Sequence, residues 1–209
     1  VGGSPYTITL GTLAANSNYT IAYTGAQFAV TPAPLTVTAD NATKVYGVGT
    51  LTFTYTTTGL QFGEAQGGVL SGALTRAPGE DVGSYGINIG SLTANLNYTI
   101  QTFVPGTLTI TPALLNVTAD ARTKIYGDAD PALTFAATGF QFADTAGSVL
   151  TGTLSRTAGE SVAGGPYAIT QGSLAANANY TVNFTGSQLS VTPATLNVTA
   201  DARSKTYGG

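Results

Sequence analysis

Short alternations of apolar and polar residues run through the chain, and they predict β-strands. Residues 35–39, 51–55 and 85–89 each carry an apolar side chain at every second position. A period of two places these side chains on one face of an extended strand, so one face packs in a core and the other meets water. The pattern therefore predicts an all-β chain.

Further apolar positions complete about six short strands in each repeat. Leu60 and Phe62 follow a glycine that ends one of these strands, and we expect their loop to cross the core. Residues 98–100 begin a later strand, and Pro105–Gly106 separates it from the apolar positions of 108–110. Because Pro-Gly is a turn signal, these two stretches predict a terminal hairpin.

One motif occurs three times and marks a tandem repeat. It reads Thr-Pro-Ala-x-x-x-Val-Thr-Ala-Asp-x-x-x-Lys-x-Tyr-Gly and begins at Thr31, Thr111 and Thr192. The tyrosines lie 126 − 46 = 80 and 207 − 126 = 81 residues apart, a period of domain size and too long for a solenoid. The predicted boundaries are the second half of a repeat at 1–34, complete repeats at 35–114 and 115–195, and the first strand and turn of another at 196–209.

Very short connections join the repeats. Only Thr-Pro-Ala separates the last strand of one repeat from the first strand of the next. Proline fixes its own φ angle and keeps the preceding residue extended. We therefore expect stiff joints and an elongated rod of small β domains.

The remaining motif residues are interpreted as structural residues of these joints. We expect the aspartate to cap a turn through backbone amides, the lysine to pair across the joint, the tyrosine to pack there and the glycine to take a positive φ. A polar binding spot at the aspartate and lysine is the alternative. The residues concerned are Pro32, Asp40, Lys44, Tyr46, Gly47, Pro112, Asp120, Lys124, Tyr126, Gly127, Pro193, Asp201, Lys205 and Tyr207.

Other tyrosines lie in phase with apolar strand residues. They are Tyr85, Tyr98, Tyr167 and Tyr180. This phase favours a place in the core over an exposed aromatic platform for sugars.

Composition narrows the function classes. Charged residues make up only 8% of the chain, and the seven Lys and Arg residues are scattered, which argues against nucleic-acid binding. No apolar run within the segment is long enough to span a membrane. Cysteine and histidine are absent, which excludes disulfides, thiol nucleophiles, His-based triads and His-ligated metals. We expect no enzyme and no cofactor.

Carboxylates are the remaining candidates for site chemistry. Asp128 and Asp130, with Asp144, form the one cluster that would suit calcium, which prefers several hard oxygen ligands. In contrast, Glu80 and Glu160 each follow an arginine by four residues, which predicts ion pairs.

The recurrent motif, with Gly-Glu at Gly79 and Gly159 and Gly-x-Leu at Gly90, resembles the MBG domain of the Tyr-Gly type. The resemblance covers essentially the whole chain. It implies tandem repeats of large bacterial surface proteins and adhesins, a β-grasp-like or related β-rich fold, and no catalytic residue.

We therefore expect a stiff stalk or fibre segment of a bacterial extracellular surface protein, either displayed on the cell or secreted. Adjacent repeats of the same chain are the expected partners, together with other copies in a fibre. Two alternatives are a module that binds a glycan or a protein, and a subunit of a self-assembling extracellular filament.

Overall fold

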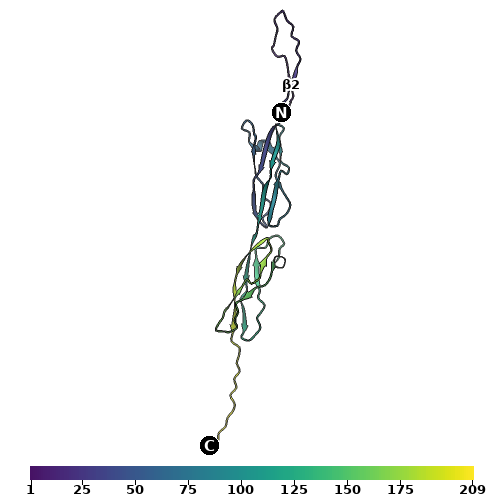
Figure 1. The fold of residues 1–209 in the computed structure, drawn as a ribbon. Coiled ribbons are helices and arrows are strands. Elements are labelled where there is room, and N and C mark those ends of the chain that lie inside the picture. The colour runs from purple at the N-terminus through teal and green to yellow at the C-terminus, as the bar shows by residue number, and fades with distance from the viewer. The chain divides into compact units, whose positions relative to one another are not determined.

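The computed structural model describes all 209 residues and forms two compact units, Val1–Thr111 and Pro112–Gly209 (Figure 1). Each unit contains one β domain, and the first also carries a hairpin of β1 (Tyr6–Ile8) and β2 (Ala26–Phe28). The only helices, α1 (Gln66–Val69) and α2 (Ala146–Val149), are four residues long each. The all-β tandem architecture predicted from the alternation is confirmed. No helix has the length and hydropathy needed to cross a membrane.

The strands of the two domains correspond one to one. The first domain has β3 (Ala33–Ala39), β4 (Ala42–Val45), β5 (Tyr55–Thr58), β6 (Leu70–Ser71), β7 (Thr75–Arg76), β8 (Gly83–Asn88), β9 (Thr93–Ala94), β10 (Tyr98–Val104) and β11 (Gly106–Thr111). The second has β12 (Ala113–Ala119), β13 (Arg122–Ile125), β14 (Phe135–Thr138), β15 (Leu150–Thr151), β16 (Ser155–Arg156), β17 (Tyr167–Thr170), β18 (Ala175–Ala176), β19 (Tyr180–Thr185) and β20 (Ser187–Thr192).

Each domain is built from a three-stranded and a four-stranded sheet. In the first domain the orders are β10-β3-β5 and β4-β11-β8-β7, with a small β6-β9 pair beside them. The second domain repeats both orders as β14-β12-β19 and β13-β20-β17-β16. The same sequence pattern therefore produces the same topology twice.

The core lies between the two sheets. Along β12 the side chains alternate between buried and exposed without a break, as the period of two predicts. A buried cluster joins Ala119 of the three-stranded sheet to Ile169 and Leu189 of the four-stranded sheet, with Phe184 packed against it. Leu35, Val37, Ile87 and Leu108 are buried in the same way in the first domain.

Two long segments run parallel to each other through each domain. In the first domain the opening segment consists of β3 and β4 (33–45) and the closing segment of β10 and β11 (98–111). β3 pairs with β10 in parallel and β4 pairs with β11 in parallel. The chain thus begins the domain at one end of this pair and leaves it at the other, roughly 40 Å away for thirteen extended residues. The second domain has the same opening (113–125) and closing (180–192) segments.

The predicted terminal hairpin is wrong. β10 and β11 pair with different partners and belong to different sheets, although Pro105 alone separates them. Gly106 is buried where the chain passes from one sheet to the other, and a Cβ there would lie 2.7 Å from the carbonyl oxygen of Asp40. The glycine permits this close approach of two backbones instead of a reversal of the chain.

Two smaller expectations also need correction. The strand predicted over 51–55 begins only at Tyr55, although Leu51 and Phe53 keep half-buried positions. Phe62 does not cross the core, because its side chain is fully exposed. The reason is local: Phe62 has a φ of 55°, which turns its side chain outward from the loop.

Candidate functional site

A buried lysine is the central polar feature of the first domain. Along β4, Lys44 is 6% exposed whereas the apolar Val45 beside it is 44% exposed. The Lys44 ammonium lies 2.6 Å from the carboxylate of Glu80 and donates a hydrogen bond of 2.9 Å to the carbonyl oxygen of Val48. Such partners are required because an unpaired charge is costly to remove from water.

Arg76 reaches the same carboxylate from the opposite edge of the sheet. β4 and β7 are the two edge strands of the four-stranded sheet, and Lys44 and Arg76 both pair with Glu80. The ion pair predicted between Arg76 and Glu80 is therefore confirmed. We call Lys44, Arg76 and Glu80 the charge cluster of the first domain. The hydrogen bond from Lys44, aided by the charges of Lys44 and Arg76, keeps the pKa of Glu80 below its ordinary value of 4.5.

Aromatic packing holds the cluster in place. The guanidinium carbon of Arg76 lies 5.6 Å from the ring centre of Tyr85, a cation–π distance. Only glycine fits at position 79, because the backbone has a φ of 130° and a Cβ would lie 2.3 Å from that ring. The glycine of the Gly-Glu pair thus allows the loop to bring Glu80 close to the sheet.

The second domain has the same cluster with one more carboxylate. Lys124 and Arg156 both pair with Glu160, and Arg156 lies 5.6 Å from the ring centre of Tyr167. Asp130 joins them: its carboxylate lies 2.8 Å from the Lys124 ammonium, and it accepts hydrogen bonds of 2.6 Å and 2.9 Å from Nε and Nη2 of Arg156. The bidentate geometry makes this a strong, directional pair. Asp130, and then Glu160, raise the pKa of both Lys124 and Arg156.

We expect the Asp130 carboxylate to titrate far below an ordinary aspartate. Hydrogen bonds from Arg156, then from Lys124, lower its pKa from 3.8 to about 2. Because the folded pKa is depressed, the carboxylate contributes stability that is fully present above the unfolded pKa and is lost as the pH falls through about 2. Carboxyl-carbon NMR across an acid titration measures the midpoint. The substitution Arg156→Gln is expected to raise it, and a wild-type midpoint at the unfolded value would contradict the geometry.

The three carboxylates considered for calcium have separate environments. Asp130 is held by Lys124 and Arg156, Asp144 accepts a 2.6 Å hydrogen bond from the hydroxyl of Tyr180, and Asp128 uses its backbone oxygen to accept from Lys124. No group of three acidic or other ligating side chains in the chain is placed to hold a metal ion. The structure therefore places Asp128 and Asp130 at the same lysine but does not gather the three carboxylates into one site.

The motif aspartate and lysine act within one domain. Asp40 accepts a 2.6 Å hydrogen bond from the hydroxyl of Thr54, and Asp120 accepts one from the hydroxyl of Thr134. These bonds tie the end of the first strand to the residue before β5 or β14, instead of capping backbone amides. The lysine likewise finds its carboxylate inside its own domain, so the expected pairing across the joint is wrong.

The tyrosine-glycine pairs adopt the backbone that was predicted. Gly47, Gly127 and Gly208 all have φ angles near 90°, which glycine tolerates without strain. Tyr46 is buried, Tyr126 is about half exposed and Tyr207 is fully exposed. The motif prolines Pro32, Pro112 and Pro193 are exposed, as are Asp201 and Lys205.

The four tyrosines that lie in phase with apolar strand residues belong to the core. Tyr98, Tyr167 and Tyr180 are buried and Tyr85 is half-buried, so the core interpretation is confirmed and these rings form no exposed platform. Sequence reasoning did not find the role of the Tyr98 hydroxyl.

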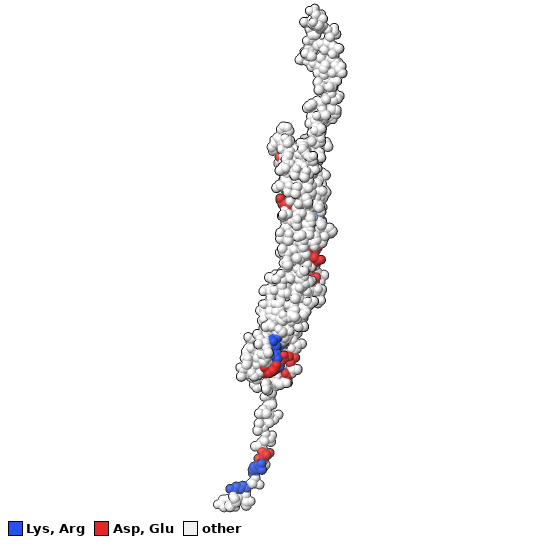
Figure 2. Space-filling model, in the orientation of Figure 1, with Lys and Arg blue, Asp and Glu red and all other residues white.

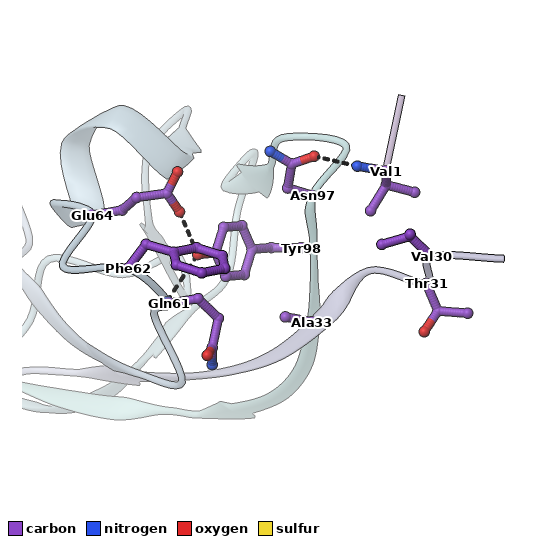
Figure 3. Close-up of a pocket in the computed structure, with 9 residues that line it drawn as sticks. All are labelled: Val1, Val30, Thr31, Ala33, Gln61, Phe62, Glu64, Asn97 and Tyr98. Carbon is purple, nitrogen blue, oxygen red and sulfur yellow. Dashed lines mark hydrogen bonds between the residues drawn. The ribbon is translucent and has the colours of Figure 1, made fainter. Parts of the chain in front are cut away.

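That hydroxyl supports the loop that carries Phe62 (Figure 3). It accepts a hydrogen bond from the backbone N–H of Gln61 and donates one to Glu64, which raises the pKa of Tyr98. Tyr180 accepts the corresponding bond from Gln141 in the second domain. The pocket beside Phe62 measures about 230 Å³, below the usual range for small-molecule sites.

Taken together, the fold and the charge clusters define a class: small two-sheet β domains repeated in tandem, each braced by an ion-pair cluster. A family model described as MBG domain (YGX type) matches residues 35–109 and 115–190. The chain belongs to this family, and the resemblance read from the motif is confirmed. MBG repeat domains are a non-catalytic structural family. No curated protein and no solved structure matched the chain.

Proposed function

We propose that these repeats are stiff spacers in the stalk of a bacterial surface protein. The observation that carries the proposal is the path of the chain: it enters and leaves each domain at opposite ends of the paired segments. A domain connected in this way adds its full length to an array, whereas one with neighbouring termini would add little. The two MBG domains that follow each other in this chain support the same role.

The connection between the domains supports stiffness. β11 ends at Thr111 and β12 begins at Ala113, so Pro112 alone lies outside a strand. The backbone carbonyl of Thr111 accepts a 2.8 Å hydrogen bond from Tyr46, and the N–H of Ala113 donates a 2.9 Å bond to Asn179. Each flanking residue is fixed to its own domain, and proline restricts the single residue between them.

Pro112→Gly tests the stiffness of this joint. We expect small-angle X-ray scattering of the wild-type chain to give the distance distribution of an extended particle, and the variant to give a broader and shorter one with both domains still folded. Pro78→Gly, in an exposed loop, is the matched control and is expected to match the wild type. Identical scattering from the two variants would contradict the proposal that Pro112 stiffens the joint. A scattering mass above that of a monomer would favour the filament alternative.

The surface of the repeats suits a spacer more than a binding module. The face drawn in Figure 2 carries few charged side chains, in keeping with a charged fraction of 8%. Secretion to the cell surface belongs to this proposal, and accessibility of the repeats to antibodies on intact cells tests it.

We further propose that the repeats act without metal or other cofactor and without catalysis. Two cations already engage the Asp130 carboxylate, so calcium would have to displace them. We therefore expect the same melting temperature in millimolar calcium and in chelator. A rise with calcium that Asp130→Asn abolishes would contradict this expectation.

A further inference from the structure

The opening and closing segments of each domain are the parts of the chain through which tension would pass. In the first domain, residues 33–38 pair in parallel with 98–104, with one β-bulge between Ile100 and Thr102, and residues 42–45 pair in parallel with 108–111. In the second domain, residues 113–118 face 180–185 and residues 122–125 face 189–192. The beginning and the end of each domain are therefore paired with each other along nearly the whole domain.

Hydrogen bonds fix each end of this pair at the point where the chain enters or leaves. At one end the N–H of Ala33 donates a 2.9 Å bond to the carbonyl oxygen of Asn97, just before β10. At the other end Thr111 accepts from the N–H of Tyr46, and its hydroxyl donates a 3.3 Å bond to the carbonyl oxygen of Lys44. The second domain repeats these contacts, including a 3.2 Å bond from the hydroxyl of Thr192 to the carbonyl oxygen of Lys124.

The direction of the strands decides how tension acts on these bonds. Tension pulls the opening segment back towards the preceding repeat and the closing segment forward towards the next. Because the segments are parallel and their free ends point in opposite directions, they must slide along each other. The evenly spaced bonds of a parallel pair then resist together. In a terminal hairpin the same tension would open the bonds one after another.

Burial strengthens this resistance. Leu35 and Val37 of the opening segment are no more than 1% exposed, and the same holds for Leu108 and Ile110 of the closing segment. Sliding would move these side chains out of register with the core, and water cannot replace the strand hydrogen bonds until the core has opened. The charge cluster adds a second connection across the sheet, because Lys44 of the edge strand β4 forms an ion pair with Glu80, which follows the opposite edge strand β7.

We propose that each repeat is a mechanical element in which the parallel opening and closing segments resist tension by shear. This inference deepens the spacer role and rests on it: such a stalk would hold its length under pulling forces because its domains stay folded. The resistance belongs to the geometry of the strands and differs from thermodynamic stability, since forced unfolding follows the unfolding barrier.

Single-molecule force spectroscopy tests this proposal by pulling on the same chain in two different directions. The 209 residues contain no cysteine, so introduced cysteines define unique attachment points. Handles at the two ends of the full chain place both domains in shear. Handles at Thr31→Cys and Thr99→Cys, both exposed positions near the beginnings of β3 and β10, pull those two strands apart from one end. Circular dichroism confirms that the double variant is folded.

We expect the unfolding force in the shear direction to be at least about twofold higher at the same loading rate, since many bonds must break together instead of in sequence. Equal forces in the two directions would overturn the proposal. The scattering comparison of Pro112→Gly is independent of this result. A stiff chain whose domains unfold at equal force in both directions would support the spacer role and contradict the shear proposal. A flexible chain whose domains resist shear would contradict the stiff spacer and support resistance by shear.

Discussion

Replacing Leu115 with alanine is expected to lower the free energy of unfolding of the second domain by about 3 kcal/mol. Leu115 lies in the middle of the core face of β12 and its side chain has no exposed surface. The substitution removes three carbon atoms and leaves a cavity. β12 pairs with strands on both sides, so the surrounding backbone has little freedom to close that cavity.

Leu114→Ala is the matched control. Leu114 precedes Leu115 on the same strand, points to the other face and is 56% exposed, so its replacement is expected to change stability by less than about 0.5 kcal/mol. Hydrogen exchange followed by mass spectrometry measures the second domain separately and uses the first as an internal reference. Equal losses for the two variants would contradict the register of β12.

Glu80→Ala is expected to destabilise the first domain by about 2 kcal/mol, a figure reduced from that of a fully buried pair because Glu80 is itself partly exposed to solvent. The substitution leaves the Lys44 ammonium, whose side chain is only 3% exposed, with the carbonyl oxygen of Val48 as its remaining partner. The cost arises mainly from this buried charge.

The second domain supplies a natural comparison. Glu160→Ala removes the corresponding carboxylate, but Lys124 keeps Asp130 at 2.8 Å, so a clearly smaller loss is expected. Thr50 occupies the place of Asp130 in the first domain, four residues after the tyrosine of the motif. Adding Thr50→Asp to Glu80→Ala is therefore expected to restore much of the lost stability. Exchange rates of the first domain measure the two variants that carry Glu80→Ala, and those of the second domain measure Glu160→Ala. Equal losses for Glu80→Ala and Glu160→Ala would exclude this explanation.

Local pattern predicted much of the fold. The alternation in residues 35–39 places Leu35 and Val37 in the core, because the period of two is a property of any strand with one buried face. The Arg76–Glu80 pair was also predictable, since four residues separate the partners within one loop.

The same rules failed where a distant segment determined the outcome. Alternation by hydrophobicity would place Val45 inward and Lys44 outward, yet the structure reverses them. The reason is Glu80, a partner 36 residues away in sequence, which no local pattern reveals. Pro105–Gly106 resembles a turn, but the crowding of Gly106 against the backbone at Asp40 depends on a sheet pairing that the sequence does not specify.

The candidate site shows the same limit. The motif indicates that Lys124 is structurally important, but it does not reveal Asp130 as the partner of Lys124. The bidentate pairing of Asp130 with Arg156 joins residues from separate strands and loops, and the sequence pattern indicates a candidate calcium ligand at Asp130 instead. The apolar pattern predicts Phe62 in the core, but the backbone of Phe62 has a positive φ of 55°, which directs the side chain outward and which the pattern does not reveal.

The parallel pairing of the opening and closing segments also determines when a repeat can fold. Ala33 pairs with Tyr98, 98 − 33 = 65 residues later, so the first strand lacks a neighbour on one side until nearly the whole repeat has been synthesised. Closing so long a loop is slow, because the entropy is lost before the contacts form. Each repeat is thus expected to leave the ribosome unfolded and to fold in a single late step, one domain after another.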